Sequence, residues 1–304
     1  MKSKLLPIVL LILLISGYLL LFPIVEHARD PLKRVQDRGM IFPPFVTKII
    51  SFEYKSIAAD FLFARASQYL GGKIANRETM DNSDMMWLYR NMLVITDLDP
   101  YFEDPYYLGN AFLTWDVGMV KEANVLLKKG VDARSWDWQL PFYLGFNKFY
   151  FLQKNSEAAD YFVIASKRPG AHNFLPTLAA RLYNNEGSTK MAIVILKEFL
   201  ENERDSRIRA RYEMRVAALE KMLFLESAVS QYRAKSGKFP RNLQTLVQSG
   251  IIAKIPKDPY GGVFYLDKDG SVKTSSKLAP IIPNTTTDKD KKFSPSLQYA
   301  PRDS

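Results

Sequence analysis

Side chains that usually carry catalysis are scarce in this chain of 304 residues. It has no cysteine, and its two histidines, His27 and His172, lie far apart in the sequence. The chain therefore lacks the thiolates and imidazoles that most hydrolytic triads, thiolate zinc sites and disulfides require. It also has no phosphate-binding glycine loop, no nucleophile elbow and no convincing pair of catalytic carboxylates. These observations disfavour an enzyme and predict neither a cofactor nor a metal site.

One acidic string near the carboxy terminus has some of the oxygen ligands of a calcium site. The string is Asp267-Lys268-Asp269-Gly270, and the longer EF-hand pattern is missing around it. We interpret it instead as the turn of a β-hairpin between Phe264-Tyr265-Leu266 and Ser271-Val272-Lys273-Thr274, in which Gly270 supplies the required backbone angles. Calcium binding is the less favoured alternative.

The composition indicates a folded protein with dispersed charge. Hydrophobic residues make up 47% of the chain and charged residues 24%, with a formal net charge of +10. The length suits one extended repeat domain or two compact domains. Lys and Arg are spread along the chain and form no dense basic block. We therefore expect no nucleic-acid partner, while work beside anionic lipid is compatible with the charge.

The segment from Leu5 to Val25 contains no charged residue. A helix of this length spans the hydrocarbon core of a bilayer, which is about 30 Å thick. The segment ends in Phe22-Pro23-Ile24-Val25-Glu26 and not in the small-x-small site of a cleaved signal peptide. We therefore expect a retained transmembrane anchor.

The orientation of this anchor does not follow from its flanking charges. Lys2 and Lys4 lie on one side of the segment, and Arg29, Lys33 and Arg34 lie on the other. An apolar run that begins near the amino terminus is typical of a signal anchor, and the lack of cysteine fits an exported bacterial chain. We expect a single-pass protein of the bacterial inner membrane, with most of the chain in the periplasm.

Beyond the anchor, the pattern of the sequence changes several times. Prolines follow the anchor, a helical pattern begins at Phe52, short strand-like segments begin near Gly237, and Pro, Ser and Thr are frequent at the carboxy-terminal end. The predicted boundaries are a transmembrane anchor at 1–25, a juxtamembrane connector at 26–51, helical repeats at 52–205, a long capping helix at 206–236, a small β module at 237–276 and a disordered tail at 277–304.

The first helix after the connector is predicted to contain YKSIAADFLFARASQYL. We expect Ser51 or Ser56 to cap it and Gly71-Gly72 to end it. Its mostly apolar, buried side is predicted from the spacing of four residues: Ile57, Phe61, Ala64 and Gln68.

Small and apolar residues recur beyond this helix at nearly constant intervals. The equivalent positions are Leu88, Ala123, Ala158 and Ala192, which are separated by 35, 35 and 34 residues. Four residues after each lies a large apolar side chain: Met92, Leu127, Phe162 and Leu196. Such a period is typical of stacked helix pairs, in which each pair buries the apolar face of its neighbour, and an irregular helical bundle is the alternative.

The stretch 52–205 resembles the tetratricopeptide repeat family, whose units are helix pairs of about 34 residues. The resemblance implies a mainly α protein, with a tetratricopeptide-like solenoid after one transmembrane helix and a small α+β module at the carboxy-terminal end. In such arrays the first helices line a concave surface. Asn110, Asn147 and Arg181 occupy similar places in successive units, and the resemblance implies that they hydrogen-bond an extended partner segment.

Aromatic residues are the other notable feature of this region. The tryptophans are Trp87, Trp115, Trp136 and Trp138, and the run PFYLGFNKFYFL lies nearby. A ligand cage or a base-stacking surface is one interpretation. We favour packing between stacked helices, where aromatic rings fill the gaps, and we assign no cofactor to them.

The order SAVSQY, SGKFP, LQTLVQSG, IIAKIPKDPYGG and VFYL resembles the carboxy-terminal half of type II secretion major pseudopilins. In its turn motif, Asp258 and Pro259 lead to Gly261 and Gly262, which permit a tight reversal before the next strand. The chain lacks the prepilin-peptidase site of that family, and its apolar segment lies far upstream. The resemblance therefore implies a pilin-like head on a repeat scaffold and not a polymerising pilin subunit.

These features predict a membrane-anchored, non-enzymatic adaptor that binds protein partners in a bacterial envelope assembly, such as a pilus or a type II secretion system. An accessory subunit of a membrane transporter or export complex is the alternative. An enzyme is disfavoured because no group of residues with catalytic spacing is found.

Overall fold

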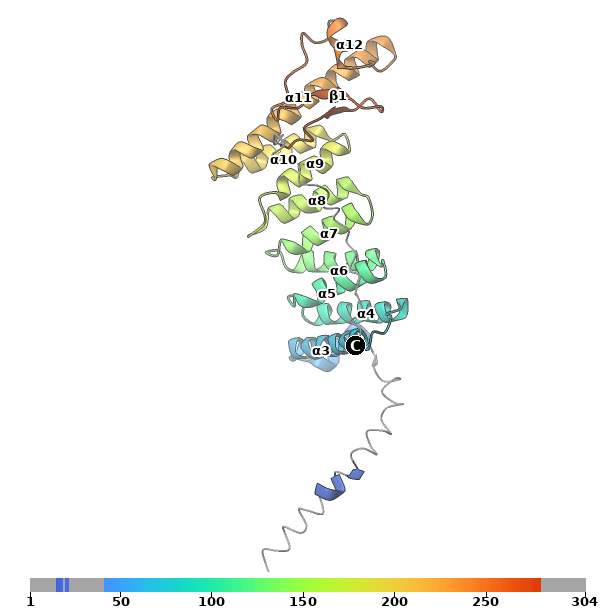
Figure 1. Ribbon diagram of the computed structural model, residues 1–304. Helices are drawn as coiled ribbons and strands as arrows, with labels where there is room; N and C mark the ends of the chain where they lie inside the picture. Colours follow the sequence, from blue (N-terminus) through green and yellow to red (C-terminus); the bar gives the residue numbers. More distant parts are fainter. Residues whose placement is uncertain (1–14, 19, 22–40, 280–304) are drawn as a thin grey trace, which may run out of the picture. The chain divides into compact units, whose positions relative to one another are not determined.

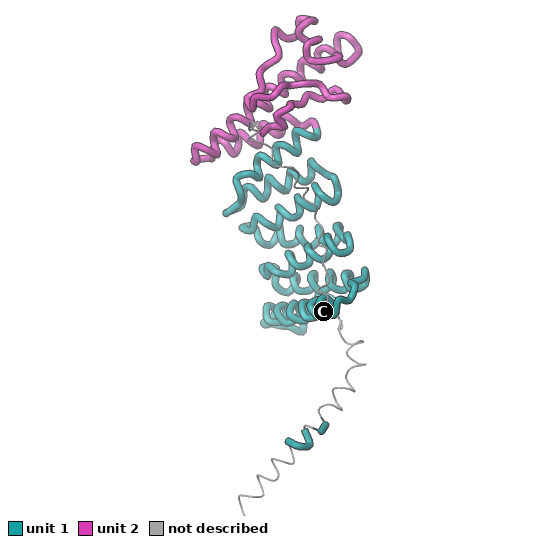
Figure 2. The backbone as a smooth tube through the Cα atoms, in the orientation of Figure 1, with its two compact units in different colours: residues 1–186 teal, residues 187–304 magenta. Residues whose placement is uncertain are grey.

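The structure is a computed structural model that describes residues 15–18, 20–21 and 41–279, and this part of the chain is mainly helical (Figure 1). A small two-stranded sheet lies near its carboxy-terminal end. The mainly helical class and the small sheet are confirmed. The chain divides into two compact units, residues 1–186 and residues 187–304 (Figure 2).

Helices of unit 1 follow one another in sequence and pack against their neighbours. Their bounds are α2 (Pro44–Ser51), α3 (Lys55–Ala75), α4 (Asn82–Leu98), α5 (Asp104–Ala111), the π-helical turn η1 (Phe112–Asp116), α6 (Val120–Ala133), α7 (Gln139–Tyr150), α8 (Asn155–Ser166) and α9 (Leu175–Asn185). The first three equivalent positions of the predicted repeat fall in α4, α6 and α8, where Leu88, Ala123 and Ala158 are fully buried.

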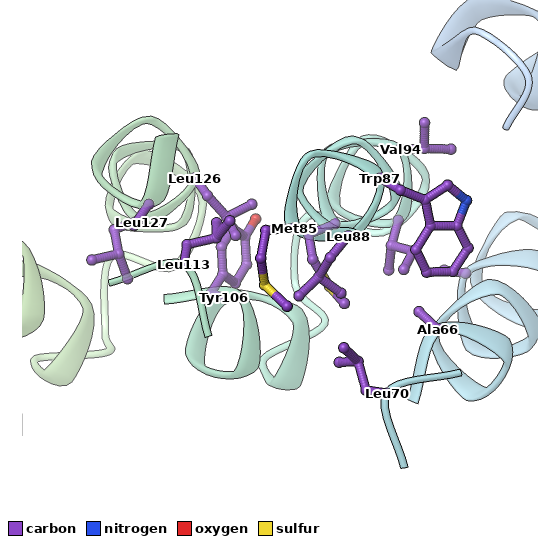
Figure 3. Packing of buried hydrophobic residues seen from close by; sticks show 14 of the residues in the cluster. Ala66, Leu70, Met85, Trp87, Leu88, Val94, Tyr106, Leu113, Leu126 and Leu127 are labelled. Carbon is purple, nitrogen blue, oxygen red and sulfur yellow. The ribbon is translucent and has the colours of Figure 1, made fainter. Parts of the chain in front are cut away.

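Close approach of the helices of unit 1 depends on glycine. A Cβ atom on Gly109 of α5 would lie 2.5 Å from Cδ2 of Leu126 in α6. A Cβ atom on Gly145 of α7 would lie 2.9 Å from the ring of Phe162 in α8. Both distances are shorter than van der Waals contact, so a larger residue at either position would require Leu126 or Phe162 to move. Figure 3 shows buried apolar side chains of α3 to α6, Leu126 among them.

Helix α3, the first helix after the predicted connector, differs from its prediction. The residue before α3 is Tyr54, whose side chain makes no capping hydrogen bond, and the helix continues through Gly71-Gly72 to Ala75. The four side chains predicted to be buried are all exposed: Ile57, Phe61, Ala64 and Gln68. The buried residues of α3 lie on another face: Ala59, Ala66, Tyr69 and Leu70.

Polar contacts with α4 explain why α3 does not end at its glycines. Asp84 is fully buried, and its carboxylate accepts hydrogen bonds of 2.5 Å from the Tyr69 hydroxyl and 2.5 Å from the Lys73 ammonium. These two donors flank Gly71-Gly72 and hold both sides of the pair in one helix. The hydrogen bond to Asp84 also raises the pKa of Lys73. Asp84 and Asp81 form a capping box at the start of α4, so one carboxylate orders both helices.

Two arginines link the loops that follow successive helix pairs. Arg134, after α6, donates to the carbonyl of Tyr101 and to Glu103, which both lie in the loop before α5. Arg168, after α8, donates to the carbonyls of Val131, Arg134 and Asp137 at distances of 2.7–2.9 Å. The guanidinium groups thus satisfy backbone acceptors that the helix ends leave open.

Unit 2 is built on one long helix. Its elements are α10 (Thr189–Asn202), α11 (Ser206–Ser236), α12 (Leu243–Gln248), β1 (Phe264–Leu266) and β2 (Val272–Thr274). The Asp205 carboxylate caps α11 at the backbone of Arg207 and Ile208, and Gly237 ends the helix in the left-handed conformation. The predicted hairpin is confirmed, because β1 and β2 pair antiparallel with Phe264 opposite Thr274. Unit 2 begins at residue 187, so α10 and α11 share one compact unit with the β module.

Most of the predicted anchor and almost all of the predicted tail lie outside the described residues. Residues 15–18 and 20–21, which belong to the predicted anchor, are helical. Within the described ranges, no helix has both the length and the apolar character that crossing a bilayer requires. The described part of the predicted connector contains α2, which begins with Pro44 at a position where proline is favoured.

We predict that Gly145→Ala destabilises unit 1 by about 1–3 kcal/mol, because the added methyl group overlaps Phe162 and lies 3.1 Å from the Ala158 carbonyl. Gly72→Ala in α3 is the matched control, since nothing lies within 4 Å of its Cβ position. That substitution should stabilise the protein by up to about 1 kcal/mol through helix propensity. Tryptophan fluorescence during urea unfolding measures both variants. Equal unfolding midpoints for the two would contradict the close contact between α7 and α8.

Candidate partner-binding site

A pocket of about 490 Å³ opens on unit 1 between α5, η1 and α7. The pocket is within the size range of small-ligand sites, and it is large enough to hold one or two side chains of a protein partner. Its lining residues are Tyr107, Asn110, Ala111, Trp115, Phe142, Tyr143, Phe146 and Asn147. They come from the first helices of neighbouring predicted repeats. No carboxylate, imidazole, ammonium or guanidinium group is among these lining residues.

Two of the predicted site residues meet in this pocket. The amide nitrogen of Asn147 donates to Oδ1 of Asn110 at 2.7 Å and to Oδ1 of Asn124, on α6, at 2.9 Å. Asn147 is 1% exposed and Asn110 is 6% exposed. Both amide hydrogens of Asn147 are therefore used within the protein. Within the described part of the chain, the Asn147 oxygen and the Asn110 nitrogen are not engaged in a hydrogen bond.

The third predicted site residue is not part of the pocket. Arg181 lies on α9, is exposed, and is absent from the pocket lining. The structure thus brings together the candidates of two successive predicted repeats and leaves out the candidate of the next one. An arginine on an exposed helix face is also common in proteins without any binding role.

The wall of the pocket is aromatic, and a π-helical turn carries one of its rings. After α5 the helix widens into η1, and Trp115 in this turn is 60% exposed. Its ring lies 6.4 Å from Phe146 and 5.7 Å from Tyr150, centroid to centroid. Phe146 in turn stacks on Tyr150 at 5.4 Å with a 9° angle between the planes. Single-turn π-helices of this kind are often found at functional sites.

Aromatic residues only partly follow the expectation that they fill gaps between helices. Trp87 is only 9% exposed and is packed between helices as expected. Trp115 is 60% exposed and Trp136 is 50% exposed, so the prediction of packing between helices is wrong for these two residues. The reason is the local backbone, since η1 places Trp115 at the surface, and Trp136 lies in the loop before α7.

A buried network supports the floor of the pocket. The Tyr107 hydroxyl donates to Asp137 at 2.8 Å, and Arg134 Nε donates to the same carboxylate at 3.1 Å. Burial, and then the hydrogen bond to Asp137, raises the pKa of Tyr107 well above its usual range. Tyr107 therefore stays a neutral donor at physiological pH. Its ring is fixed between Asp137 and Tyr143, whose centroid lies 5.7 Å away.

The predicted turn motif of unit 2 is organised by a buried carboxylate. Asp258 is 6% exposed, and it accepts hydrogen bonds from Ser276 Oγ at 2.6 Å, from Thr274 Oγ1 and from the backbone of Tyr260 at 2.8 Å. Burial alone would raise the pKa of Asp258, but these hydrogen bonds outweigh it and lower the pKa. The carboxylate thus ties the turn to the end of β2.

Both glycines of the motif are required by this arrangement. Gly261 has a φ of +82°, which L-residues with a side chain rarely adopt. A Cβ atom on Gly262 would lie 2.6 Å from the Ser276 nitrogen and 2.7 Å from Asp258 Oδ2. Pro259, half-buried between Asp258 and Tyr260, limits the backbone at the start of the turn. The motif is a structural turn with its polar groups directed inward.

The acidic hairpin turn pairs with groups of its own hairpin. Asp267 forms an ion pair with Lys273, and Asp269 accepts hydrogen bonds from the backbone and hydroxyl of Ser271. Among the described residues, no group of three or more His, Asp or Glu side chains is placed to hold a metal ion.

Comparison of the chain with family models, curated proteins and solved structures found no match.

We predict that Asp258→Asn weakens the hairpin of unit 2 by about 1–3 kcal/mol at neutral pH, because a buried, hydrogen-bonded charge is lost. The folded pKa lies below the unfolded value of 3.8, so the carboxylate stabilises the fold above that value. The difference between wild type and variant should disappear as the pH falls through the folded pKa. Hydrogen exchange of the backbone amides of residues 263–276, corrected for intrinsic exchange rates, measures the stability of the hairpin in both proteins. Exposed Glu201→Gln is the control, and a difference that persists at low pH would contradict the role of the charge.

Proposed function

We propose that this protein is a membrane-anchored, non-enzymatic adaptor whose helical repeats bind a protein segment in the pocket of α5, η1 and α7. The pocket carries the proposal, because its aromatic wall is exposed while two asparagines on its floor are fixed by hydrogen bonds. Fixed polar groups beside an apolar surface are what a peptide-binding site needs for register and affinity.

The bound segment is proposed to be extended and uncharged where it enters the pocket. Its apolar or aromatic side chain fills the space beside Trp115 and Phe146. Its backbone offers one carbonyl and one N–H group, which match the open Asn110 nitrogen and Asn147 oxygen. The lack of charged lining residues argues against a site for a terminal carboxylate or a phosphate, both of which recruit Arg or Lys.

A tetratricopeptide-like solenoid remains our interpretation of the helix array. It is supported by the burial of all four equivalent positions, because Leu88, Ala123, Ala158 and Ala192 are each 0% exposed. It is also supported by the close contacts of Gly109 and Gly145 with the helix that follows each. Repeats of this type act as binding scaffolds and seldom enclose a catalytic pocket.

The placement of the protein in the cell is part of the proposal. The charge-free segment 5–25 and the absence of cysteine support a single-pass protein of the bacterial inner membrane with its repeats in the periplasm. The turn at Asp258 to Gly262, with its resemblance to pseudopilin heads, supports an assembly that includes a pilus or a type II secretion system.

Photo-crosslinking in native membranes tests the binding site. A photoreactive phenylalanine analogue in place of Tyr150, which is 51% exposed beside the pocket, should form an adduct with one protein partner. Ala111→Trp fills the pocket at an exposed position and should lower the adduct yield at least about tenfold, a difference of about 1.4 kcal/mol.

Trp136→Ser is the matched control, because Trp136 is exposed on the same unit and does not line the pocket. It should leave the adduct yield unchanged. Undiminished crosslinking in the Ala111→Trp protein, with its circular dichroism intact, would exclude this pocket as the binding site.

A further inference from the structure

We propose that the surface formed by α2 and the first turns of α3 lies in the lipid headgroup region of the membrane. This surface, which we call the α2–α3 edge, consists of residues 42–61. The inference rests on the anchor of the proposed function and adds a second membrane contact, made by the folded unit itself.

The first observation is that α2 is an apolar helix with no buried residue. Its large apolar side chains are turned to solvent, with Phe45 66% exposed, Ile49 65% and Ile50 62%. A short helix is stable mainly through burial of its apolar face, so we expect another molecule or segment to contact the exposed apolar side chains of α2. Proteins seldom leave a contiguous apolar surface of this kind uncovered.

The second observation is that exposed apolar side chains are also found after α2 and in the first turns of α3. The large hydrophobic residues that are exposed in residues 42–61 are Phe42, Phe45, Ile49, Ile50, Phe52, Tyr54, Ile57 and Phe61. Aromatic residues make up most of this set, and four of these five are phenylalanines, a residue found on the apolar face of helices that lie in the membrane interface. Lys48 and Lys55 are exposed in the same range, as are Glu53 and Asp60, so the edge has no net charge. Lysines can extend their ammonium groups to lipid phosphates.

The backbone between the two helices has an unusual conformation. Phe52 has a φ of +44°, in a region that bulky residues rarely adopt, and its side chain is 73% exposed. No neighbouring side chain is covered by this arrangement, since the residues on both sides of Phe52 are exposed or half-buried. Conformations of this type are found most often at functional sites. Here the conformation directs a phenylalanine outward at the centre of the edge.

The length of the chain identifies lipid as the cover. Sixteen peptide steps separate Val25, the end of the charge-free segment, from Ile41, where the described structure resumes. Fully extended, they reach at most about 58 Å. The α2–α3 edge is therefore held close to any bilayer in which the segment is inserted. Tethering raises the effective concentration of the edge at the bilayer, so even weak contacts with the interface are formed much of the time.

The natural absence of cysteine permits a direct test with the full-length protein. Single cysteines replace Ile49 or Phe61 on the edge, and Val125 of α6 or Val194 of α10 as equally exposed controls. Each protein carries an environment-sensitive fluorophore and is reconstituted in vesicles of phosphatidylcholine and phosphatidylglycerol. Quenching by nitroxide-bearing lipids reports contact with the bilayer, and quenching by aqueous iodide reports contact with water.

We expect labels at 49 and 61 to be quenched several-fold more by the nitroxide lipids, and less by iodide, than labels at 125 and 194. If the edge labels respond as the controls do, while the protein floats with the vesicles, the inference is wrong and the anchor stands. Protection from both quenchers would mean that protein covers the edge, either the amino-terminal segment or a second copy. Failure to float would refute the anchor, and this inference with it.

A combined variant, Ile49→Ser with Ile57→Ser, separates lipid contact from fold. Both residues are exposed, so helical content should be unchanged. A label at position 61 in this variant should lose most of its lipid quenching. Full retention of that quenching would also contradict the inference.

Discussion

The architecture of unit 1 depends on a steric constraint at the contacts between successive helices. Gly109 and Gly145 leave no room for a Cβ atom, since Leu126 and Phe162 occupy the space where it would lie. Small residues let the helix axes approach, and the large side chains of the next helix then fill the interior without gaps. Ala158 takes part in the same contact, because its carbonyl lies 3.1 Å from the Cβ position of Gly145.

The pocket lies next to this packing. Gly145 brings α7 against α8, where Phe142 lies 5.7 Å from Phe162, centroid to centroid, and Phe142 and Phe146 also line the pocket together with α5 and η1. The amides of Asn110, Asn124 and Asn147 then join α5, α6 and α7 in one buried hydrogen-bonded group. A polar group of this kind has to be satisfied in a single geometry, and it therefore fixes the floor of the site.

The periodicity of the sequence predicts the buried contact positions between helices and the hairpin correctly. Leu88, Ala123 and Ala158 were predicted as contact positions and are fully buried, and the hairpin with Gly270 forms as its turn residues predicted. The face of α3 was mispredicted, because Ile57 and Phe61 have helical spacing but are exposed. Spacing identifies an apolar side of a helix, but it does not say whether protein or another medium covers that side.

The candidate site was predicted only in part. Asn110 and Asn147 were identified through their places in successive units, and they do meet. Arg181 has the equivalent position in the next predicted unit but does not line the pocket, because only two neighbouring predicted units form it. The exposure of Trp115 was not predictable, since no residue type marks a π-helical turn reliably. The four-residue spacing of Phe142, Phe146 and Tyr150 was a signal that could have indicated the aromatic wall.

The paired arginines of the loops have a mechanical consequence. Arg134 joins its own loop to the one before it, and Arg168 repeats the link one helix pair later, each through several charge-assisted hydrogen bonds. Guanidinium groups remain charged at all physiological pH values. A pulling force along unit 1 would load the bonds of each arginine together and not one after another. The loops that each arginine joins should therefore separate only when several of these bonds break together.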